Sequence, residues 1–353
     1  MKAYALVEPG RMEWIDVEKP ELPGDYGAVL KPIAIAPCSS DVHTIFENGS
    51  PKPPNWIMGH ECLAEVVETG RLVKDFKPGD RVLVPAITPD WRDLGIQEGN
   101  FTHPAGSFTG MKLSISIPGI FAEYFSLPDA DTSLVHLPED VSLEAALMCV
   151  DVVTTGFTGV EAAEVKFGDT VCVLGIGPIG LMAVAGAKLR GAADILAVGT
   201  RPVCVELAKK YGATRIINYK EGDIVSQVLD ATGGRGVDSS IIVGGNQNTF
   251  TQAVKMTCYG TGIISNLNYY TGEDDLMVPK AEWGRGMAGK TIRGELCRGG
   301  RVRIERLLRM VQCGRIHPED LITHTYHGWE ELEDALIIMR DKPAELVKSM
   351  VLL

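Results

Sequence analysis

The chain has 353 residues, a formal net charge of −12, 45% hydrophobic residues and 23% charged residues. The length predicts two domains, and the composition is that of a soluble globular protein. The acidic balance argues against nucleic acid or an anionic membrane surface as the main partner, because both require a basic face. The N-terminal residues lack the long apolar core of a signal peptide, so we expect a cytoplasmic protein.

Two further features of the composition bear on the class of protein. The uncharged run at residues 171–187 is slightly short for a membrane helix and is interrupted early by glycine and proline, so we expect no membrane span. The eight cysteines are scattered without a Cys-x-x-Cys pair. In a chain of this size, that pattern indicates reduced thiols and not a disulfide framework.

The first 150 residues contain short apolar runs that are broken by proline and glycine. The runs at residues 28–35, 64–67 and 81–85 are typical of β-strands, and the Pro- and Gly-rich breaks are typical of turns. This part of the chain therefore reads as an irregular, mostly β region.

From residue 170 the pattern changes to alternating buried strands and helices. We predict strands at 170–174, 194–198, 215–217, 237–243 and 261–264, and helices at 178–190, 203–211, 223–231 and 249–256. This alternation predicts a doubly wound parallel sheet with helices on both faces, and so an α/β fold class.

The alternation stops near Arg293, and the tail carries predicted helices at 302–311 and 329–339 and a strand at 347–353. We expect this tail to return to the first domain. A local basic cluster in the tail is interpreted as a solvated helix face or a subunit contact. It comprises Arg298, Arg301, Arg303, Arg306 and Arg309.

A glycine motif follows the predicted strand at 170–174. Gly175, Gly177 and Gly180 have G-x-G-x-x-G spacing, which is weak alone but gains meaning between a buried strand and a helix. The first glycine permits a tight turn, the second lets the backbone approach a pyrophosphate, and the third allows the helix to pack closely on the strand. The helix N-terminus then attracts the phosphates.

The end of the next strand indicates which dinucleotide is preferred. An NAD site usually has an acidic residue there to bind the ribose 2′-hydroxyl, and this chain has none. Gly199 makes room, Thr200 offers a hydroxyl and Arg201 offers a guanidinium to a 2′-phosphate. We therefore predict NADP(H).

A candidate metal site consists of Cys38, His60 and Asp151, a ligand set that suits a catalytic zinc with one open position. Taken singly, Cys38 reads as a buried thiol and His60 as a core histidine. Because the gaps between the three residues are long, spacing by itself leaves the metal site undecided.

Several motifs together resemble the medium-chain dehydrogenase/reductase family over nearly the full length. They are PCSSDVH at 37–43, GHE at 59–61, PGDRV at 78–82, TTG at 154–156 and GIGPIG at 175–180. Within the family, the chain is most similar to the bacterial NADP-dependent secondary alcohol dehydrogenases. That likeness rests on Asp151, where many relatives carry cysteine, and on PDW at 89–91, GTRP at 199–202 and YHG at 326–328.

The resemblance implies a fold and a metal site. It implies a GroES-like catalytic domain at 1–154, completed by 296–353, and a Rossmann domain at 155–295. It implies that Cys38, His60 and Asp151 bind the catalytic zinc, and that Glu61 can approach the metal. Many relatives hold a second, structural zinc with four closely spaced cysteines. Between Glu61 and Leu147 this chain has only Cys62, so we expect one zinc.

The resemblance also implies the chemistry. Zinc acts as a Lewis acid on the oxygen of a small alcohol or ketone, hydride passes to or from NADP(H), and the protein forms a homotetramer. Ser40 and His43 would relay the proton, although local turn capping is the alternative for both. Further cofactor contacts would come from the glycine turn and from distant segments. These are Gly175, Ile176, Gly177, Pro178, Ile179, Gly180, Tyr219, Asn266, Leu267, Asn268 and Lys342.

The residues that shape the substrate pocket in similar proteins match Ala86, Ile87 and Met111. Met111 stands where the best-known relatives carry tryptophan, which replaces a rigid wall with a flexible thioether. These uncharged positions favour a small apolar secondary alcohol or ketone. A polyol, sugar or amino-alcohol dehydrogenase is the alternative within the family, and a nucleotide-binding protein without catalytic activity is a more distant one.

Overall fold

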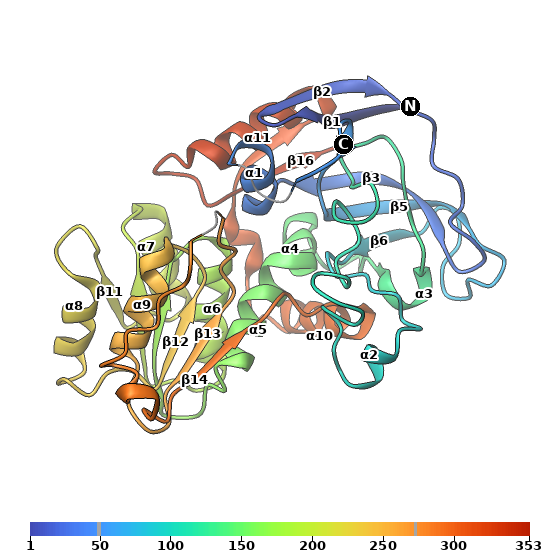
Figure 1. The fold of residues 1–353 in the computed structure, drawn as a ribbon. Coiled ribbons are helices and arrows are strands. Elements are labelled where there is room, and N and C mark those ends of the chain that lie inside the picture. The colour runs from blue at the N-terminus through green and yellow to red at the C-terminus, as the bar shows by residue number, and fades with distance from the viewer. Residues whose placement is uncertain (48–50, 272–273) are drawn as a thin grey trace. The chain divides into compact units, whose positions relative to one another are not determined.

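The computed structural model describes residues 1–47, 51–271 and 274–353. Within these ranges the chain divides into two compact units (Figure 1). One unit joins Met1–Thr154 to Cys297–Leu353, and the other is Thr155–Leu296. Each unit has its own buried apolar core, which is the physical requirement for an independent domain.

The first unit is mostly β. A three-stranded sheet has the order β2-β1-β4, and a larger sheet has the order β15-β16-β3-β5-β6-β8, with β7 paired to β3. The predicted strands at 28–35, 64–67, 81–85 and 347–353 are confirmed within β3, β5, β6 and β16. The strands are β1 (Lys2–Glu8), β2 (Arg11–Asp16), β3 (Ala28–Ala36), β4 (Trp56–Ile57), β5 (Glu61–Thr69), β6 (Arg81–Val84), β7 (Phe125–Leu127), β8 (Val135–His136), β15 (Ile322–His327) and β16 (Lys348–Leu352).

The tail of the chain completes this sheet, as the sequence led us to expect. β16 pairs antiparallel with β3, with Val351 opposite Ile35, so the last strand lies beside one of the first. The helices of this unit are α1 (Ser39–Phe46), α2 (Leu94–Gln97), α3 (Ala130–Ser133), α4 (Leu143–Met148), α10 (Arg301–Gln312) and α11 (Leu332–Asp341). Short helical turns are η1 (Cys149–Val153), η3 (Pro318–Leu321) and η4 (Trp329–Glu331).

The second unit is the predicted doubly wound sheet. All six strands are parallel, in the order β11-β10-β9-β12-β13-β14, and the order reverses between β9 and β12. Helices α6 and α7 pack together, as do α8 and α9. The strands are β9 (Thr170–Leu174), β10 (Asp194–Val198), β11 (Arg215–Ile217), β12 (Ser239–Ile242), β13 (Ile263–Asn266) and β14 (Thr291–Gly294). The helices are α5 (Thr154–Ala162), α6 (Pro178–Leu189), α7 (Pro202–Tyr211), α8 (Ile224–Ala231), α9 (Gln247–Met256) and η2 (Gly284–Gly286).

The uncharged run at 171–187 is not one helix, because residues 171–174 belong to β9 and α6 begins only at Pro178. Among the described residues, one helical stretch is long and apolar enough by composition to cross a membrane, namely Leu143–Ala162. Its most apolar window is 83% buried inside the protein, as in the core helix of a globular protein. That stretch is weak evidence for a membrane span.

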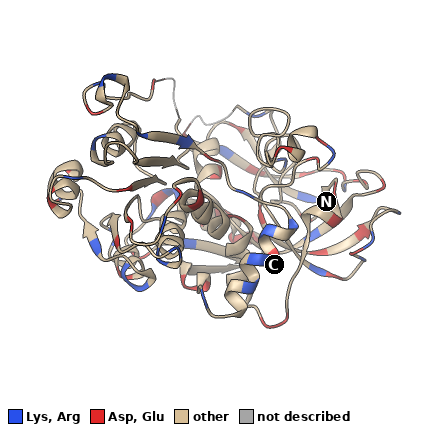
Figure 2. Ribbon diagram, turned by 90° about the horizontal axis from the view of Figure 1, so that it is seen from below, with Lys and Arg blue, Asp and Glu red and all other residues tan. Residues whose placement is uncertain are grey.

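Figure 2 shows acidic and basic residues interspersed along the helices and loops of the chain. The basic cluster of the tail is only partly a solvated helix face. Arg306 and Arg309 are exposed on α10, as interpreted from the sequence. The interpretation is wrong for Arg301. Its side chain is only 25% exposed, because it turns back onto the part of the first unit that holds Asp75.

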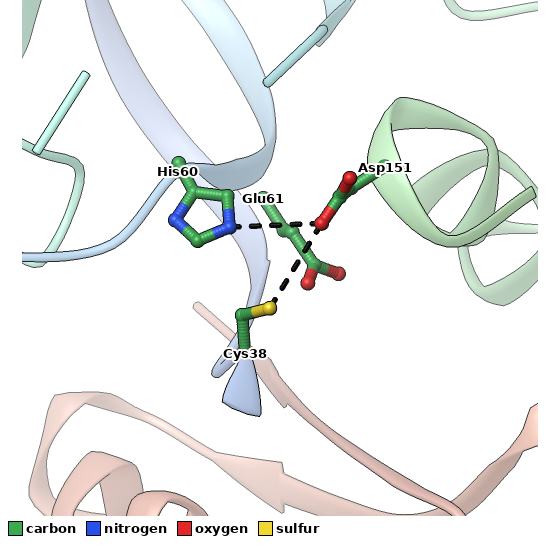
Figure 3. Close-up of side chains that lie close together, drawn as sticks. All are labelled: Cys38, His60, Glu61 and Asp151. Atoms are coloured by element: carbon green, nitrogen blue, oxygen red, sulfur yellow. Dashed lines mark hydrogen bonds and ion pairs between the residues drawn. The ribbon is translucent and has the colours of Figure 1, made fainter. Parts of the chain in front are cut away.

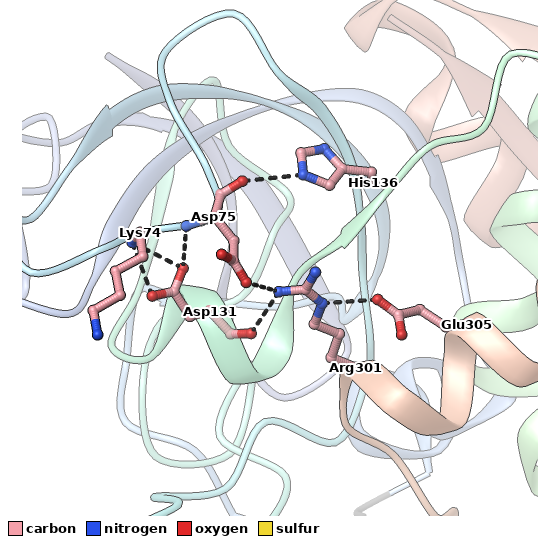
Figure 4. Close-up of polar contacts among 6 residues, drawn as sticks. All are labelled: Lys74, Asp75, Asp131, His136, Arg301 and Glu305. Carbon is pink, nitrogen blue, oxygen red and sulfur yellow. Dashed lines mark hydrogen bonds and ion pairs between the residues drawn. The ribbon is translucent and has the colours of Figure 1, made fainter.

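Arg301 joins the start of α10 to a distant loop and to helix α3 (Figure 4). Its guanidinium forms ion pairs with Asp75 and, at 2.8 Å, with Glu305, and it donates a hydrogen bond to the backbone oxygen of Asp131 at 3.3 Å. It also lies 5.3 Å from the centre of the Phe76 ring. The carboxylate of Asp131 in turn accepts backbone hydrogen bonds from Lys74 and Asp75.

We predict that Arg301→Ala destabilises the protein by about 1–3 kcal/mol, because it removes charge-assisted hydrogen bonds that connect segments distant in sequence. Urea denaturation checks this through the midpoint, with an unchanged slope. Arg306→Ala, an exposed arginine on the same helix, is the matched control and should change the midpoint little. Equal shifts for the two variants would contradict the role given to Arg301.

Candidate metal and dinucleotide sites

Four side chains that can bind a metal meet in the first unit (Figure 3). One ligand atom from each of Cys38, His60, Glu61 and Asp151 lies within 4.8 Å of all the others, and all four residues are buried. The Nε2 atom of His60 lies 3.6 Å from Oδ2 of Asp151, and Sγ of Cys38 lies 3.9 Å from the same oxygen. The structure thus brings together residues that are up to 113 positions apart.

Secondary structure explains how three of these residues reach the site. Cys38 is the residue before α1, two residues after the end of β3, and Glu61 begins β5, where it pairs with Ala36 of β3. Asp151 lies in η1, a stretch of π-helix. The π-helical turn is rare and is often found at functional sites. Here it carries the carboxylate that comes from farthest along the chain.

The chemistry of this group fits a divalent cation such as zinc. A thiol, an imidazole and two carboxylates are zinc ligands, and burying several acidic groups together is costly unless a cation balances them. The Oε2 atom of Glu61 is buried without a hydrogen-bond partner. Burial raises the pKa of Glu61 to about 7, against the opposing effect of Lys348 and with a contribution from Asp151.

Asp41 is a part of the site that the sequence reasoning did not single out. Its Oδ2 accepts a hydrogen bond from the backbone N–H of Cys38 at 2.9 Å, and its Oδ1 lies 3.5 Å from Nδ1 of His60. A carboxylate behind a metal-binding histidine orients the ring. Burial lowers the pKa of His60, but the charge of Asp41 and hydrogen bonds to Asp151, Asp41 and Cys38 outweigh it and raise the pKa well above its usual value.

Lys348 was also missed. This buried lysine at the start of β16 donates a hydrogen bond of 2.6 Å to Oε1 of Glu61. Asp41 had a local signal, since it stands three residues after Cys38 in the PCSSDVH motif. Lys348 had only a weak one, which is a single charge in an otherwise uncharged terminal strand.

The predicted proton-relay residues lie on α1, beside this metal-binding group. Ser40 and His43 are three residues apart, which places them on one side of the helix. The Nδ1 atom of His43 pairs with the carboxylate of Glu47 one turn further along.

The predicted pocket residues lie on two segments of the first unit. Ala86 and Ile87 are buried after β6, and the backbone N–H of Ala86 donates to the carbonyl of Val150, the neighbour of Asp151. The N–H of Thr88 donates to Gly110, which brings the segment of Met111 close to Ile87. The positions predicted for the pocket are thereby linked to one another and to the metal-binding helix turn.

The glycine motif of the second unit has the geometry that its sequence predicts. Gly175 has a φ of 100°, and Gly177 precedes α6, which begins at Pro178. A Cβ at Gly180 would lie 1.8 Å from the backbone oxygen of Gly175, so no larger residue fits. At Gly177 the nearest atom to such a Cβ is 4.0 Å away, on Arg201, so this backbone faces open space. A phosphate can approach there.

The residues predicted to read the 2′-phosphate meet at the ends of β10 and β11. Gly199 follows β10, where a Cβ would lie 2.2 Å from Ile176, and Arg201 is the residue before α7. The hydroxyl of Thr200 donates to the phenol oxygen of Tyr219 at 2.9 Å. Gly199, Thr200 and Arg201 therefore lie at the carboxyl edge of the parallel sheet, where such folds bind nucleotides.

The remaining predicted cofactor residues lie on two other segments. Asn266 ends β13 at the same edge of the sheet, and its side chain bonds to the backbone of Asn268 and to the Tyr270 hydroxyl. Leu267 donates its N–H to Ile242. Lys342 belongs to the first unit, where it ends α11 in the left-handed conformation with a φ of 48°.

Comparison with known proteins places these sites in one family. The family described as alcohol dehydrogenase GroES-like domain matches residues 24–139, and the family described as zinc-binding dehydrogenase matches residues 178–311. The chain belongs to the zinc-dependent alcohol dehydrogenases of the medium-chain dehydrogenase/reductase family.

Individual relatives agree with this assignment. The chain is 53% identical to the NADP-dependent isopropanol dehydrogenase of Thermoanaerobacter brockii and 51% identical to that of Clostridium beijerinckii, over 100% of each chain. Among solved structures, zinc dependent alcohol dehydrogenase 2 from Streptococcus pneumonia, in its apo form, matches with a TM-score of 0.89 and 28% identity. That match covers 100% of this chain and 98% of the other. The predicted fold class is confirmed.

We predict that Asp151→Ala lowers the zinc content to a small fraction of that of the wild-type protein, because a charged ligand is lost, while the fold persists. Metal analysis of the purified variant, with circular dichroism for the fold, measures this. Cys149→Ala, a buried non-ligand on the same π-helical turn, is the control and should keep its zinc. Full zinc content in the Asp151 variant would refute its place among the ligands.

Proposed function

We propose that this protein is a zinc-dependent oxidoreductase that interconverts small secondary alcohols and ketones by hydride transfer with NADP(H). The observation that carries the proposal is the buried group of Cys38, His60, Glu61 and Asp151. The names of the relatives from Thermoanaerobacter brockii and Clostridium beijerinckii support both the substrate class and the cofactor.

In this proposal one unit binds the metal and the other binds the dinucleotide. Residues 1–154 and 296–353 form the catalytic domain, which holds the metal, and residues 155–295 form the domain that binds the dinucleotide. Zinc would be held by Cys38, His60 and Asp151, with Glu61 within reach, and it would supply Lewis-acid polarisation of the substrate oxygen. We propose one zinc per chain, since Cys62 is the one cysteine between Glu61 and Leu147.

The side chains of α1 would move the proton that the reaction releases or consumes. Ser40 stands two residues after Cys38, so its hydroxyl would exchange the proton with the substrate oxygen. His43 would pass the proton onward, because an imidazole can accept a proton on one ring nitrogen and release one from the other. The pairing of its Nδ1 atom with the exposed carboxylate of Glu47 supports this route toward solvent.

The dinucleotide would bind along the carboxyl edge of the parallel sheet. The backbone from Gly175 to Gly180 and the N-terminus of α6 would bind the pyrophosphate. Gly199, Thr200, Arg201 and Tyr219 would surround the 2′-phosphate. We further propose that Asn266, Leu267 and Asn268 contact the nicotinamide half and that Lys342 contributes from the end of α11.

Ala86, Ile87 and Met111 would shape the substrate pocket. Ala86 and Ile87 are buried, and none of the three positions carries a charge or a hydroxyl, which supports an apolar substrate over a polyol or sugar. We also propose that the protein is cytoplasmic and forms a homotetramer, as expected from the family resemblance.

A substrate panel tests the proposed function. With NADP and zinc, we expect 2-propanol and 2-butanol to be oxidised with a kcat/KM at least about tenfold above that for sorbitol or glycerol, because a polar substrate would leave its hydroxyls unpaired in an apolar pocket. Initial rates of NADPH formation measure the difference. A hundredfold preference for a hydroxylated substrate would instead establish a polyol dehydrogenase.

Arg201 provides a separate test of cofactor choice. We predict that Arg201→Ala weakens NADPH binding by about 10–100-fold and leaves NADH binding nearly unchanged, because only NADPH carries the 2′-phosphate. Fluorescence titration with both cofactors measures the two constants. Arg215→Ala is the control, because Arg215 begins β11 and pairs with Asp194 at 3.2 Å. Equal losses for NADPH and NADH would show that Arg201 does not read the phosphate.

A further inference from the structure

A long loop joins two of the positions that we propose for the substrate pocket. Ile87 stands just before residues 88–110 and Met111 just after them, and the loop carries the short helix α2 (Figure 1). The loop closes at its base, where the backbone N–H of Thr88 donates to the carbonyl oxygen of Gly110 at 2.8 Å. The placement of Met111 relative to Ile87 therefore depends on how this loop is packed.

An aromatic pair lies inside the loop. The ring centres of Trp91 and Phe101 are 5.9 Å apart, and the two ring planes are inclined by 42°. A Cβ at Gly110 would lie 2.2 Å from the carbonyl oxygen of Phe101, and the N–H of Gly110 donates to the carbonyl oxygen of Thr102 at 2.9 Å. One ring contact and one close backbone approach thus connect Trp91 to the residue that precedes Met111.

Trp91 is itself held from outside the loop. A Cβ at Gly300 would lie 2.5 Å from Cη2 of Trp91, so the indole ring lies against the backbone just before α10. The indole N–H donates to Oγ of the buried Ser133 at 3.4 Å. A Cβ at Gly299 would lie 2.4 Å from Cβ of Ile87. Two neighbouring glycines therefore support both the tryptophan and one of the pocket positions.

The flexibility of Met111 makes this support important. A methionine side chain has three rotatable bonds, so it does not form a rigid wall by itself. Its place relative to Ile87 depends on where the backbone at the end of the loop is held. In a site for small substrates, a displacement of about 1 Å is enough to change which molecule binds productively.

We propose that Trp91 is a positioning residue that sets which alkyl groups the substrate pocket accepts. Acting through Phe101, it holds Met111 in place beside the substrate. The proposal rests on the proposed function, because it requires a secondary alcohol in a pocket that Met111 shapes. In 2-butanol the two alkyl groups differ by one methylene, a difference that apolar pockets discriminate by about 10–200-fold. The two enantiomers of 2-butanol therefore report the position of the wall.

The test is the ratio of kcat/KM for the two enantiomers of 2-butanol, measured with the full-length zinc-loaded protein and NADP. In Trp91→Leu we expect this ratio to move toward one by at least about threefold, because a less firmly held Met111 separates methyl from ethyl less well. Trp91→Phe keeps a ring against Phe101 and should retain most of the wild-type ratio. Zinc content and circular dichroism check that each variant is folded.

Leu94→Ala is the matched control, because Leu94 lies on α2 in the same loop and is 76% exposed. It should leave the enantiomer ratio unchanged. Phe101→Leu removes the same ring contact from the other side, so it should move the ratio in the same direction as Trp91→Leu. It also covers the case in which Trp91→Leu does not fold.

A double variant separates positioning from general packing. In Trp91→Leu/Met111→Ala the enantiomer ratio should equal that of Met111→Ala alone, because without the thioether side chain the tryptophan has nothing left to position. A tryptophan that only stabilised the fold would lower the urea midpoint and leave the enantiomer ratio unchanged.

Three results would overturn the proposal. One is a wild-type ratio near one, which would mean that the pocket does not separate methyl from ethyl. Another is an unchanged ratio in Trp91→Leu and Phe101→Leu. The third is a further change of the ratio when Trp91→Leu is added to Met111→Ala. In each case, oxidation of 2-propanol by the wild-type protein leaves the proposed function standing, whereas a wild-type protein that oxidises no secondary alcohol overturns both.

Discussion

The burial of acidic side chains around His60 is the constraint on which the first unit depends. Cys38, Glu61 and Asp151 converge there and are all buried, and Asp41 stands behind the histidine. Such a collection is tolerable only when positive charge is supplied. The chain supplies one ammonium from Lys348, and a divalent cation would add further positive charge. The end of β3, the start of β5, the π-helical turn η1 and the start of β16 meet at this point.

The second unit follows a different constraint, which is close approach of backbone to backbone. A Cβ at Gly180 would collide with the carbonyl of Gly175, so the turn between β9 and α6 can exist only with glycine. At Gly177, by contrast, a Cβ would meet open space. Because these glycines have no side chains, the N-terminus of α6 can face a phosphate. The motif therefore indicates a nucleotide site only where its glycines stand between a strand and a helix.

These two kinds of constraint differ in how far the sequence could reveal them. The strands at 170–174 and 194–198 and the glycine turn between β9 and α6 are local, so periodicity and spacing predicted them to within a residue or two. The exposed strand β2 and the short edge strand β14 were missed, because exposed or short strands have weak patterns. The basic cluster misled because Arg301 folds back onto Asp75, which lies 226 residues away.

The sequence by itself determined the α/β class, the dinucleotide motif and, through the family resemblance, the identity of the candidate zinc ligands. It could not determine that Cys38, His60, Glu61 and Asp151 share one buried point, because their meeting depends on strand pairing across long separations. The tertiary structure decided that Asp41 lies behind His60 and that Lys348 lies beside Glu61, although Asp41 stands in the PCSSDVH motif. A single charged residue forms no repeating pattern in the sequence, and its role depends on which opposite charge the fold places within reach.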